Sequence, residues 1–93
     1  MDSHRLFNEL VAVARKLGVE VRLESFSTVT TTGGGFCTLG GRALILIDDH
    51  APLSTRVEAL ARALARLETE AVYMTPEARD LVATLQHRDP LPQ

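Results

Sequence analysis

The chain of 93 residues has no tryptophan, one tyrosine and three phenylalanines. With so few aromatic side chains, leucine, valine, isoleucine and alanine have to fill the core. A chain of this length buries roughly 60–70% of its unfolded surface, which is enough for one core without cross-links. We therefore expect residues 1–93 to form a single domain.

The sequence has a single cysteine, Cys37, so an internal disulfide is excluded. Chains without disulfides are typical of the reducing cytoplasm. The first ten residues, MDSHRLFNEL, contain acids and no apolar h-region, so we expect no signal peptide. The longest apolar run, Ala43–Ile47, is too short to span a bilayer. These absences predict a cytoplasmic protein that does not enter a membrane.

The sequence also lacks a cluster of positive charge. Its net charge is −2, with ten basic and twelve acidic residues spread along the chain. A nucleic-acid surface needs a concentrated positive field, so we expect no nucleic acid as a partner. Nine of the ten basic residues are arginine, a bias typical of GC-rich bacterial genomes.

Three segments carry apolar residues at helical spacing. The first begins at a capping Asp2 or Ser3 and ends before Gly18. The second spans residues 53–67. The third begins at Thr75-Pro76-Glu77, where a capping hydroxyl, a proline and an acid follow one another. We therefore predict three helices.

The remaining pattern predicts three strands. Residues 19–24 alternate between apolar and charged, which is typical of a half-buried strand. Gly40-Gly41 separates two further β-like runs, and both positions of a two-residue hairpin turn favour positive φ, which glycine adopts freely. Around this turn Cys37 would face Leu44. Ala43–Ile47 shows no alternation, so we expect both faces of that strand to be covered.

Together these elements predict a small α+β domain of order α-β-β-β-α-α. Its three-stranded, mainly antiparallel sheet would pack against the helices. Residues 27–32 fit either a strand or a loop, and Gly33–Gly35 favour a mobile loop. Residues 70–74 fit either a last helical turn or a short extended piece, and residues 89–93 form a flexible tail.

The glycines of residues 33–41 favour a hairpin over a phosphate-binding loop. Such a loop leads into the N-terminus of a helix and usually carries Gly-Lys-Ser/Thr. Here Gly33–Gly35 lead into Phe36-Cys37-Thr38-Leu39, which reads as a strand. We therefore interpret the segment as β-structure rather than as a nucleotide site.

The second half of the chain resembles, in outline, the ImmA/IrrE-type zinc-protease domain. A hairpin, GGFCTLGGRALILID, leads into a helix, STRVEALARALARL, and then into ETEAVYMTPEARDLV. In that family the helix reads roughly LAHELGH. This motif falls on residues 60–66, which read LARALAR here.

The resemblance implies that Arg62 and Arg66 stand where the metal histidines belong, and Ala63 where the general base belongs. Glu68 or Glu70 would take the place of the third ligand. The domain would thus be a degenerate, zincin-like form lacking the HExxH motif. The chain also resembles short uncharacterised bacterial proteins built around a Gly-Gly-x-Cys hairpin and an LAxAL helix, a likeness that implies no activity.

The residue types support the same expectation. Zinc needs three or four converging His, Cys, Asp or Glu ligands, whereas His4, His50 and His87 are far apart in the sequence. Guanidinium groups in place of imidazoles would repel a cation. We expect no metal, no other cofactor and no catalytic residue.

Two arginines and the cysteine remain candidates for chemistry. Arg62 and Arg66 could contact an anion, or Arg62 could pair with Glu58 on a solvated helix face. Cys37 could be a redox thiol, but a small core residue is the favoured interpretation because free cysteine is commonly buried.

Two further groups have alternative interpretations. Asp48, Asp49, His50 and Ser54 could form a hydrolase or weak metal site, or a loop with helix-capping acids. The run Val72, Tyr73 and Met74 could be an interaction surface, with Tyr73 and Met74 alternatively closing the edge of the core.

The sequence therefore favours a non-catalytic protein-interaction or regulatory module of the bacterial cytoplasm. Its partner would be a second copy in a homodimer, or another protein. The alternative is a minimal metal-dependent hydrolase that uses Asp48, Asp49, His50 and Glu70.

Overall fold

The computed structural model describes residues 2–25 and 34–88. The expected loop or strand at residues 27–32 and the expected tail at residues 89–93 lie outside these ranges. The element order confirms the predicted α+β domain. The elements are α1 (Ser3–Lys16), β1 (Glu20–Glu24), β2 (Gly34–Leu39), β3 (Arg42–Asp48), α2 (Leu53–Leu64) and α3 (Pro76–Arg88).

Strand β3 is the central strand of the sheet, in the order β1-β3-β2. β2 and β3 form the predicted antiparallel hairpin, with Cys37 opposite Leu44. The turn residues Gly40 and Gly41 have φ values of +59° and +80°. Because side chains are strained at such angles, two glycines are what this tight turn requires.

Strand β1 pairs with β3 in parallel, with Val21 opposite Ile45. The sheet is therefore mixed, and the prediction of a mainly antiparallel sheet holds for only one of its two strand pairs. Strand β2 lies between β1 and β3 in the sequence and runs back against β3. The direction of β1 relative to β3 is set by the connection between the strands, which the alternation of residues within a strand cannot reveal.

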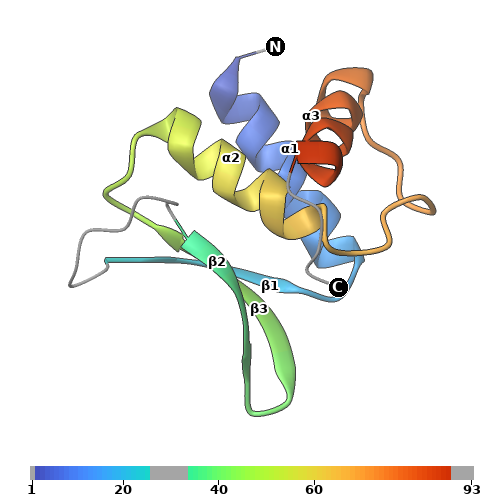
Figure 1. Ribbon diagram of the computed structural model, residues 1–93. Coiled ribbons are helices and arrows are strands. Elements are labelled where there is room, and N and C mark those ends of the chain that lie inside the picture. The colour runs from blue at the N-terminus through green and yellow to red at the C-terminus, as the bar shows by residue number, and fades with distance from the viewer. Residues whose placement is uncertain (1, 26–33, 89–93) are drawn as a thin grey trace.

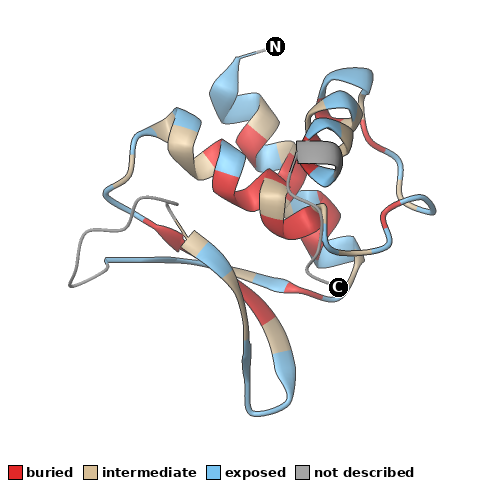
Figure 2. Ribbon diagram, in the orientation of Figure 1, coloured by how far each residue is buried: buried red, intermediate tan, exposed pale blue. Residues whose placement is uncertain are grey.

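The three helices lie on one face of the sheet (Figure 1). The core fills the space between this face and α2, with α1 and α3 packed beside α2. Buried residues are concentrated along α2 and on the sheet beneath it (Figure 2). The largest fully buried side chains are Leu10, Val13, Ile45, Ile47, Leu60, Leu64 and Val82.

The opposite face of the sheet carries no described helix (Figure 1). Leu44 and Leu46 point toward it, because Ile45 and Ile47 alternate with them and face the core. No described helix covers this second face, yet Leu44 on it is buried and Leu46 is half-buried, so the prediction that Ala43–Ile47 is covered on both faces holds in part. Leu44 is only 4% exposed, since Glu20 and Cys37 lie directly beside it on the neighbouring strands.

The helix boundaries largely follow the sequence signals. The Oδ1 atom of Asp2 accepts hydrogen bonds from the backbone N–H groups of His4 at 2.9 Å and Arg5 at 3.1 Å, which caps α1. At the start of α3, the hydroxyl of Thr75 accepts a bond from the N–H of Ala78 at 3.4 Å. No helix in the described part of the chain is long and apolar enough to cross a membrane.

Helix α2 ends at Leu64, three residues before the predicted end at residue 67. The N–H of Arg66 bonds to the carbonyl of Ala63, so the chain tightens there and leaves the α-helix. Gln86 of α3 donates to the carbonyl of Ala65 at 3.1 Å. This bond satisfies a carbonyl at the helix end from a distant segment, which apolar periodicity does not indicate.

Candidate functional site

The side of the sheet that carries no described helix has an apolar centre, which we call the open sheet face. We define it by Arg22, Cys37, Leu39, Leu44 and Leu46, which line an open pocket of about 390 Å³. The strand register places them on one side, with Arg22 opposite Leu46, and Cys37 opposite Leu44. The three strands thus bring together residues that are dispersed in the sequence.

The open sheet face combines a shielded apolar floor with an exposed end. Leu44 is almost fully buried at its centre, whereas Leu39, at the end of β2 beside the turn, is 60% exposed. The hairpin extends away from the helices, so Leu39 lies where the helices give it no cover (Figure 1). An exposed leucine continuous with a leucine floor is typical of a surface that another molecule covers.

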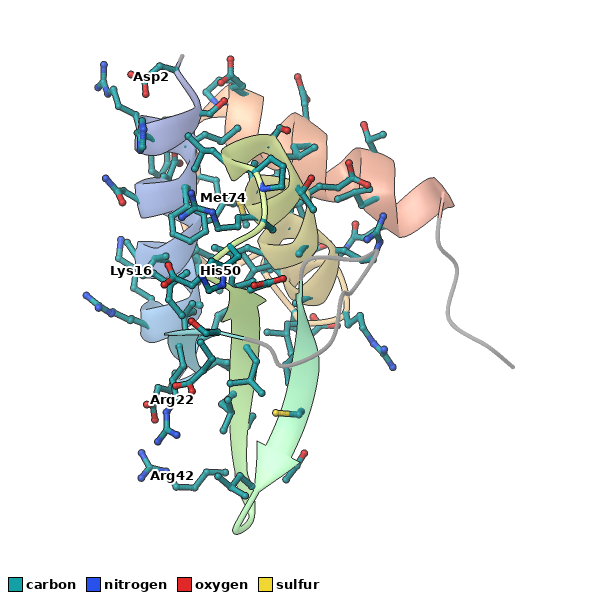
Figure 3. The ribbon with its side chains drawn as sticks, turned by 90° about the vertical axis from the view of Figure 1, so that its left-hand side faces the viewer. Asp2, Lys16, Arg22, Arg42, His50 and Met74 are labelled. Carbon is teal, nitrogen blue, oxygen red and sulfur yellow. The ribbon has the colours of Figure 1, made fainter. Side chains whose placement is uncertain are left out.

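A pair of opposite charges borders this face along β1. The Nε atom of Arg22 donates to Oε2 of Glu20 at 2.7 Å. This hydrogen bond lowers the pKa of Glu20 and raises that of Arg22, and the nearby charge of Arg42 lowers the pKa of Glu20 a little further. Arg22 and Arg42 extend from the same side of the sheet (Figure 3). The border is polar and charge-balanced, as interface rims are.

Cys37 belongs to this face, and its predicted place in the core is wrong. Its thiol is free and half-buried, and the residue is not part of the core cluster. The neighbouring Phe36 faces the helices instead and packs against the core. Because residues of a strand point alternately to opposite faces, the packing of Phe36 directs Cys37 to the open side.

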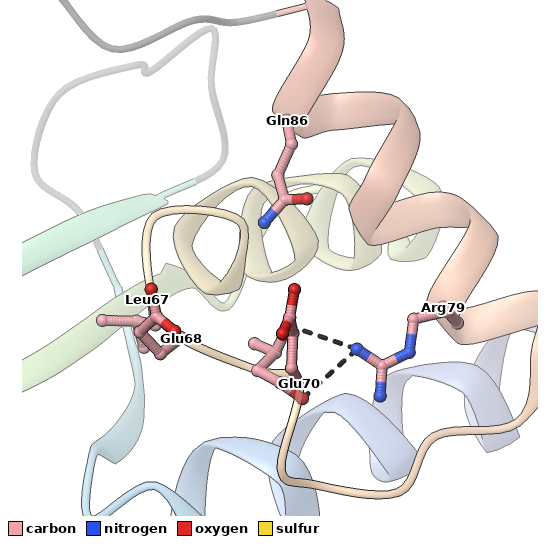
Figure 4. Close-up of a pocket in the computed structure, with 6 residues that line it drawn as sticks. Leu67, Glu68, Glu70, Arg79 and Gln86 are labelled. Carbon is pink, nitrogen blue, oxygen red and sulfur yellow. Dashed lines mark hydrogen bonds between the residues drawn. The ribbon is translucent and has the colours of Figure 1, made fainter.

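A second depression, of about 500 Å³, lies beside the loop that joins α2 to α3 (Figure 4). Its central side chain, Arg79, donates to the backbone carbonyls of Thr69 at 3.2 Å and Val72 at 2.6 Å. Gln86 is likewise engaged with the helix end. These polar groups hold the loop in place, so we interpret the depression as structural.

The proposed run Val72, Tyr73 and Met74 lies in this loop but does not form one exposed surface. Met74 is 5% exposed and belongs to the core, and Val72 is partly buried against it. Tyr73 alone points outward, with 75% of its surface exposed. A single exposed aromatic side chain remains as a possible contact.

Arg62 and Arg66 differ in their positions. Arg62 lies on α2 and its Nη2 donates to Oε1 of Glu58 at 2.8 Å, which is the ion pair that the spacing predicted. Arg66 lies beyond the end of α2 and is exposed. Ala63, between them, is buried. The helical face that was expected to align both guanidinium groups thus ends before Arg66.

Asp48, at the end of β3, binds the backbone with its side chain. Oδ1 of Asp48 accepts a hydrogen bond from the N–H of His50 at 2.9 Å, and the N–H of Ala51 bonds to the carbonyl of Asp48. Asp48 therefore closes a turn before α2. The helix cap itself is Pro52, without a side-chain bond, so the expected helix-capping role of Asp48 and Asp49 is wrong.

The structure does not show the convergence of Asp48, Asp49, His50 and Glu70 that the alternative of a metal-dependent hydrolase requires. Glu70 lines the depression beside the α2–α3 loop, together with Glu68, which the resemblance offered as the other third-ligand position. Among residues 2–25 and 34–88, no three His, Cys, Asp or Glu side chains lie close enough to hold a metal ion.

Sequence reasoning missed the open sheet face, although one signal for it was present. In β1 the charged residues Glu20, Arg22 and Glu24 all fall on one side of the strand. A charged side of this kind faces water. Once β1 and β3 are paired, the residues of β3 opposite these charges lie on the same face of the sheet. The missing information was the register, which joins this charged side to Leu44 and Leu46.

Comparisons with protein families, with curated proteins and with solved structures found no significant match to this chain.

Proposed function

We propose that this protein is a non-catalytic protein-interaction or regulatory module of the bacterial cytoplasm that binds a protein through the open sheet face. The observation that carries the proposal is the one-sided packing of the sheet. All three described helices lie on one face, and leucine and cysteine side chains line the other.

The energetics favour a protein partner over a charged ligand. Covering apolar surface stabilises a complex by about 25 cal/mol per Å². Two of the charges at the border, Arg22 and Glu20, are already paired with each other. A partner would therefore gain most from the leucines, and the charged border would orient it.

The first experiment compares the wild type with a Leu46→Lys variant. Leu46 lies on the central strand and is half-buried, so a lysine there charges the open sheet face without altering either sheet edge. Tagged proteins are used to capture partners from the native bacterium, and mass spectrometry quantifies them. We expect the variant to lose proteins that the wild type and a Tyr73→Asp control both retain.

Circular dichroism confirms that each variant is folded. If the folded Leu46→Lys variant retains the same proteins as the wild type, the open sheet face is not the binding surface.

A second experiment addresses the non-catalytic part of the proposal. We expect elemental analysis of protein purified without a metal-affinity tag to find no stoichiometric zinc, since Arg62 and Arg66 occupy the positions of ligands in the resembled proteases. About one zinc per chain would overturn this part and favour the metal-dependent hydrolase.

A further inference from the structure

The two edges of the sheet differ in how they are protected. Edge strand β1 carries three charged residues among its five, and charge is a common device against unwanted strand pairing. Edge strand β2, which reads GGFCTL, has no charged residue and no proline. Of the two edges of the sheet that the described strands form, β2 is the one that neither charge nor proline protects from another strand.

The register of the hairpin shows which backbone groups β2 offers. A two-residue turn makes Leu39 and Arg42 a hydrogen-bonded pair, and such pairs recur at every second residue. The backbone N–H and C=O groups of Cys37 therefore form hydrogen bonds with β3, whereas those of Phe36 and Thr38 point away from β3. These groups match the spacing of an added antiparallel strand.

We infer that β2 pairs antiparallel with β2 of a second copy, across a two-fold axis that passes between the two Cys37 residues. Phe36 then lies opposite the partner's Thr38, and each such pair exchanges two hydrogen bonds. Leu39 lies opposite the partner's Gly35, so a bulky side chain meets a position without one. This inference rests on the proposed function and names one partner, the chain itself.

The size of the open sheet face supports pairing of two copies at the β2 edge. With strands about 4.8 Å apart and about 3.3 Å per residue, three strands of about six residues cover only about 300 Å². A standard interface buries about 800 Å² of each partner. Pairing through β2 joins two open faces into one continuous six-stranded surface of twice the extent, which a further protein can cover.

The dimer axis also brings the two thiols together. In this register Cys37 faces the partner's Cys37 as a non-hydrogen-bonded pair, for which the Cα atoms are about 4.5 Å apart. That separation is within the range that a disulfide spans. Both side chains lie on the open sheet face, since Cys37 lines it.

The first test uses the unmodified protein. Light scattering coupled to size exclusion should show a dimer that dissociates over a dilution series from high to low micromolar concentration. A contact between two six-residue strands is much smaller than a standard interface and is therefore weak. Mild oxidation with copper–phenanthroline, in which oxygen accepts the two electrons, should join the chains through Cys37. A monomer mass throughout, or a dimer that yields no disulfide, overturns the inference.

The second test removes one edge donor. Thr38→Pro eliminates an N–H that points away from β3, and proline is tolerated at such edge positions. We expect the dissociation constant to rise by more than about tenfold, because each copy loses a hydrogen bond to its partner. Thr38→Val keeps the N–H and the size of the side chain, so it should retain the dimer.

The controls separate this inference from the proposed function. A dimer that survives in folded Thr38→Pro, or is lost in Tyr73→Asp, refutes pairing through β2. Neither result bears on partner capture by the open sheet face, which the Leu46→Lys variant tests. If Thr38→Pro fails to fold, the oxidation of wild-type Cys37 decides the question.

Discussion

Glu9 of α1 accepts two hydrogen bonds from Thr75, which lies 66 residues later in the chain. Its Oε2 receives the backbone N–H at 2.6 Å, and its Oε1 receives the hydroxyl at 2.8 Å. The carboxylate therefore caps the start of α3 from a neighbouring helix, where negative charge also complements the helix dipole. This contact fixes the position of α3 relative to α1.

Removal of this cap should destabilise the fold. In Glu9→Ala the N–H of Thr75 loses its acceptor in a partly buried place, so we expect the free energy of unfolding to fall by about 1–3 kcal/mol. Urea denaturation measures the change. Asn8→Ala, at an exposed neighbouring position on α1, should stay within about 0.5 kcal/mol of the wild type. Equal stabilities of the two variants would refute the capping role.

Gly34 should tolerate no side chain, whereas Gly35 should. A Cβ atom at Gly34, where φ is +145°, would meet the carbonyl oxygen of Leu46 and lie 2.9 Å from Cα of Ile47. These are backbone atoms of the central strand and cannot rotate away. We expect Gly34→Ala to lose about 1–3 kcal/mol in thermal or urea unfolding.

The matched control is the adjacent position. A Cβ atom at Gly35 would meet nothing within 4 Å, and its φ is not in the left-handed region. Gly35→Ala should therefore be within about 0.5 kcal/mol of the wild type. A loss as large as that of Gly34→Ala would show that the two strands do not approach as described.

Arg79 should hold the α2–α3 loop. It donates to the carbonyls of Thr69 and Val72, and Thr69 is buried. Arg79→Ala removes the side-chain donor from the carbonyl of Val72 and leaves the carbonyl of Thr69 with only the N–H of Val72. We therefore expect a loss of about 1–3 kcal/mol and faster hydrogen exchange in residues 69–75. Arg66→Ala, which removes an exposed guanidinium nearby, should change neither quantity.

The pair Glu20–Arg22 should produce a small dependence of stability on pH. The folded chain lowers the pKa of Glu20, chiefly through the hydrogen bond from Arg22. The stabilisation is thus fully present above the pKa of the unfolded chain and is lost as the pH falls through the lowered folded value. The pair is exposed to water, so its contribution is modest.

NMR titration of the Glu20 carboxyl tests this directly. Arg22→Gln should move its pKa up toward the ordinary value, and Arg15→Gln, on the exposed surface of α1, should leave it unchanged. An unaltered pKa in Arg22→Gln would show that the pair does not form in solution.

Much of the fold follows from local signals in the sequence. The cap at Asp2, the Gly40-Gly41 turn and the Thr75-Pro76 helix start are each encoded within a few residues, and each is confirmed. The early end of α2 and the parallel direction of β1 depend on partners far away in the sequence. Periodicity within one segment carries no information about those partners.

The candidate site was harder to predict because it is defined by a face rather than by residue types. Cys37 and Leu44 are apolar and face each other across the hairpin, so the sequence predicts both in the core. Whether such residues face the core depends on which side of the sheet the helices cover, and the three described helices cover one side. The predicted pairing of Cys37 with Leu44 is nevertheless confirmed, since it follows from the turn.

The central position of β3 also has a consequence for the order of folding. The β2–β3 hairpin closes over two residues and can form in about 1–10 μs, whereas β1 must wait for a far longer loop to close before it meets β3. We expect the hairpin to belong to the folding nucleus and β1 to join after the main barrier. Val21→Ala should therefore accelerate unfolding and leave the refolding rate nearly unchanged in stopped-flow measurements, while Ile45→Val slows refolding.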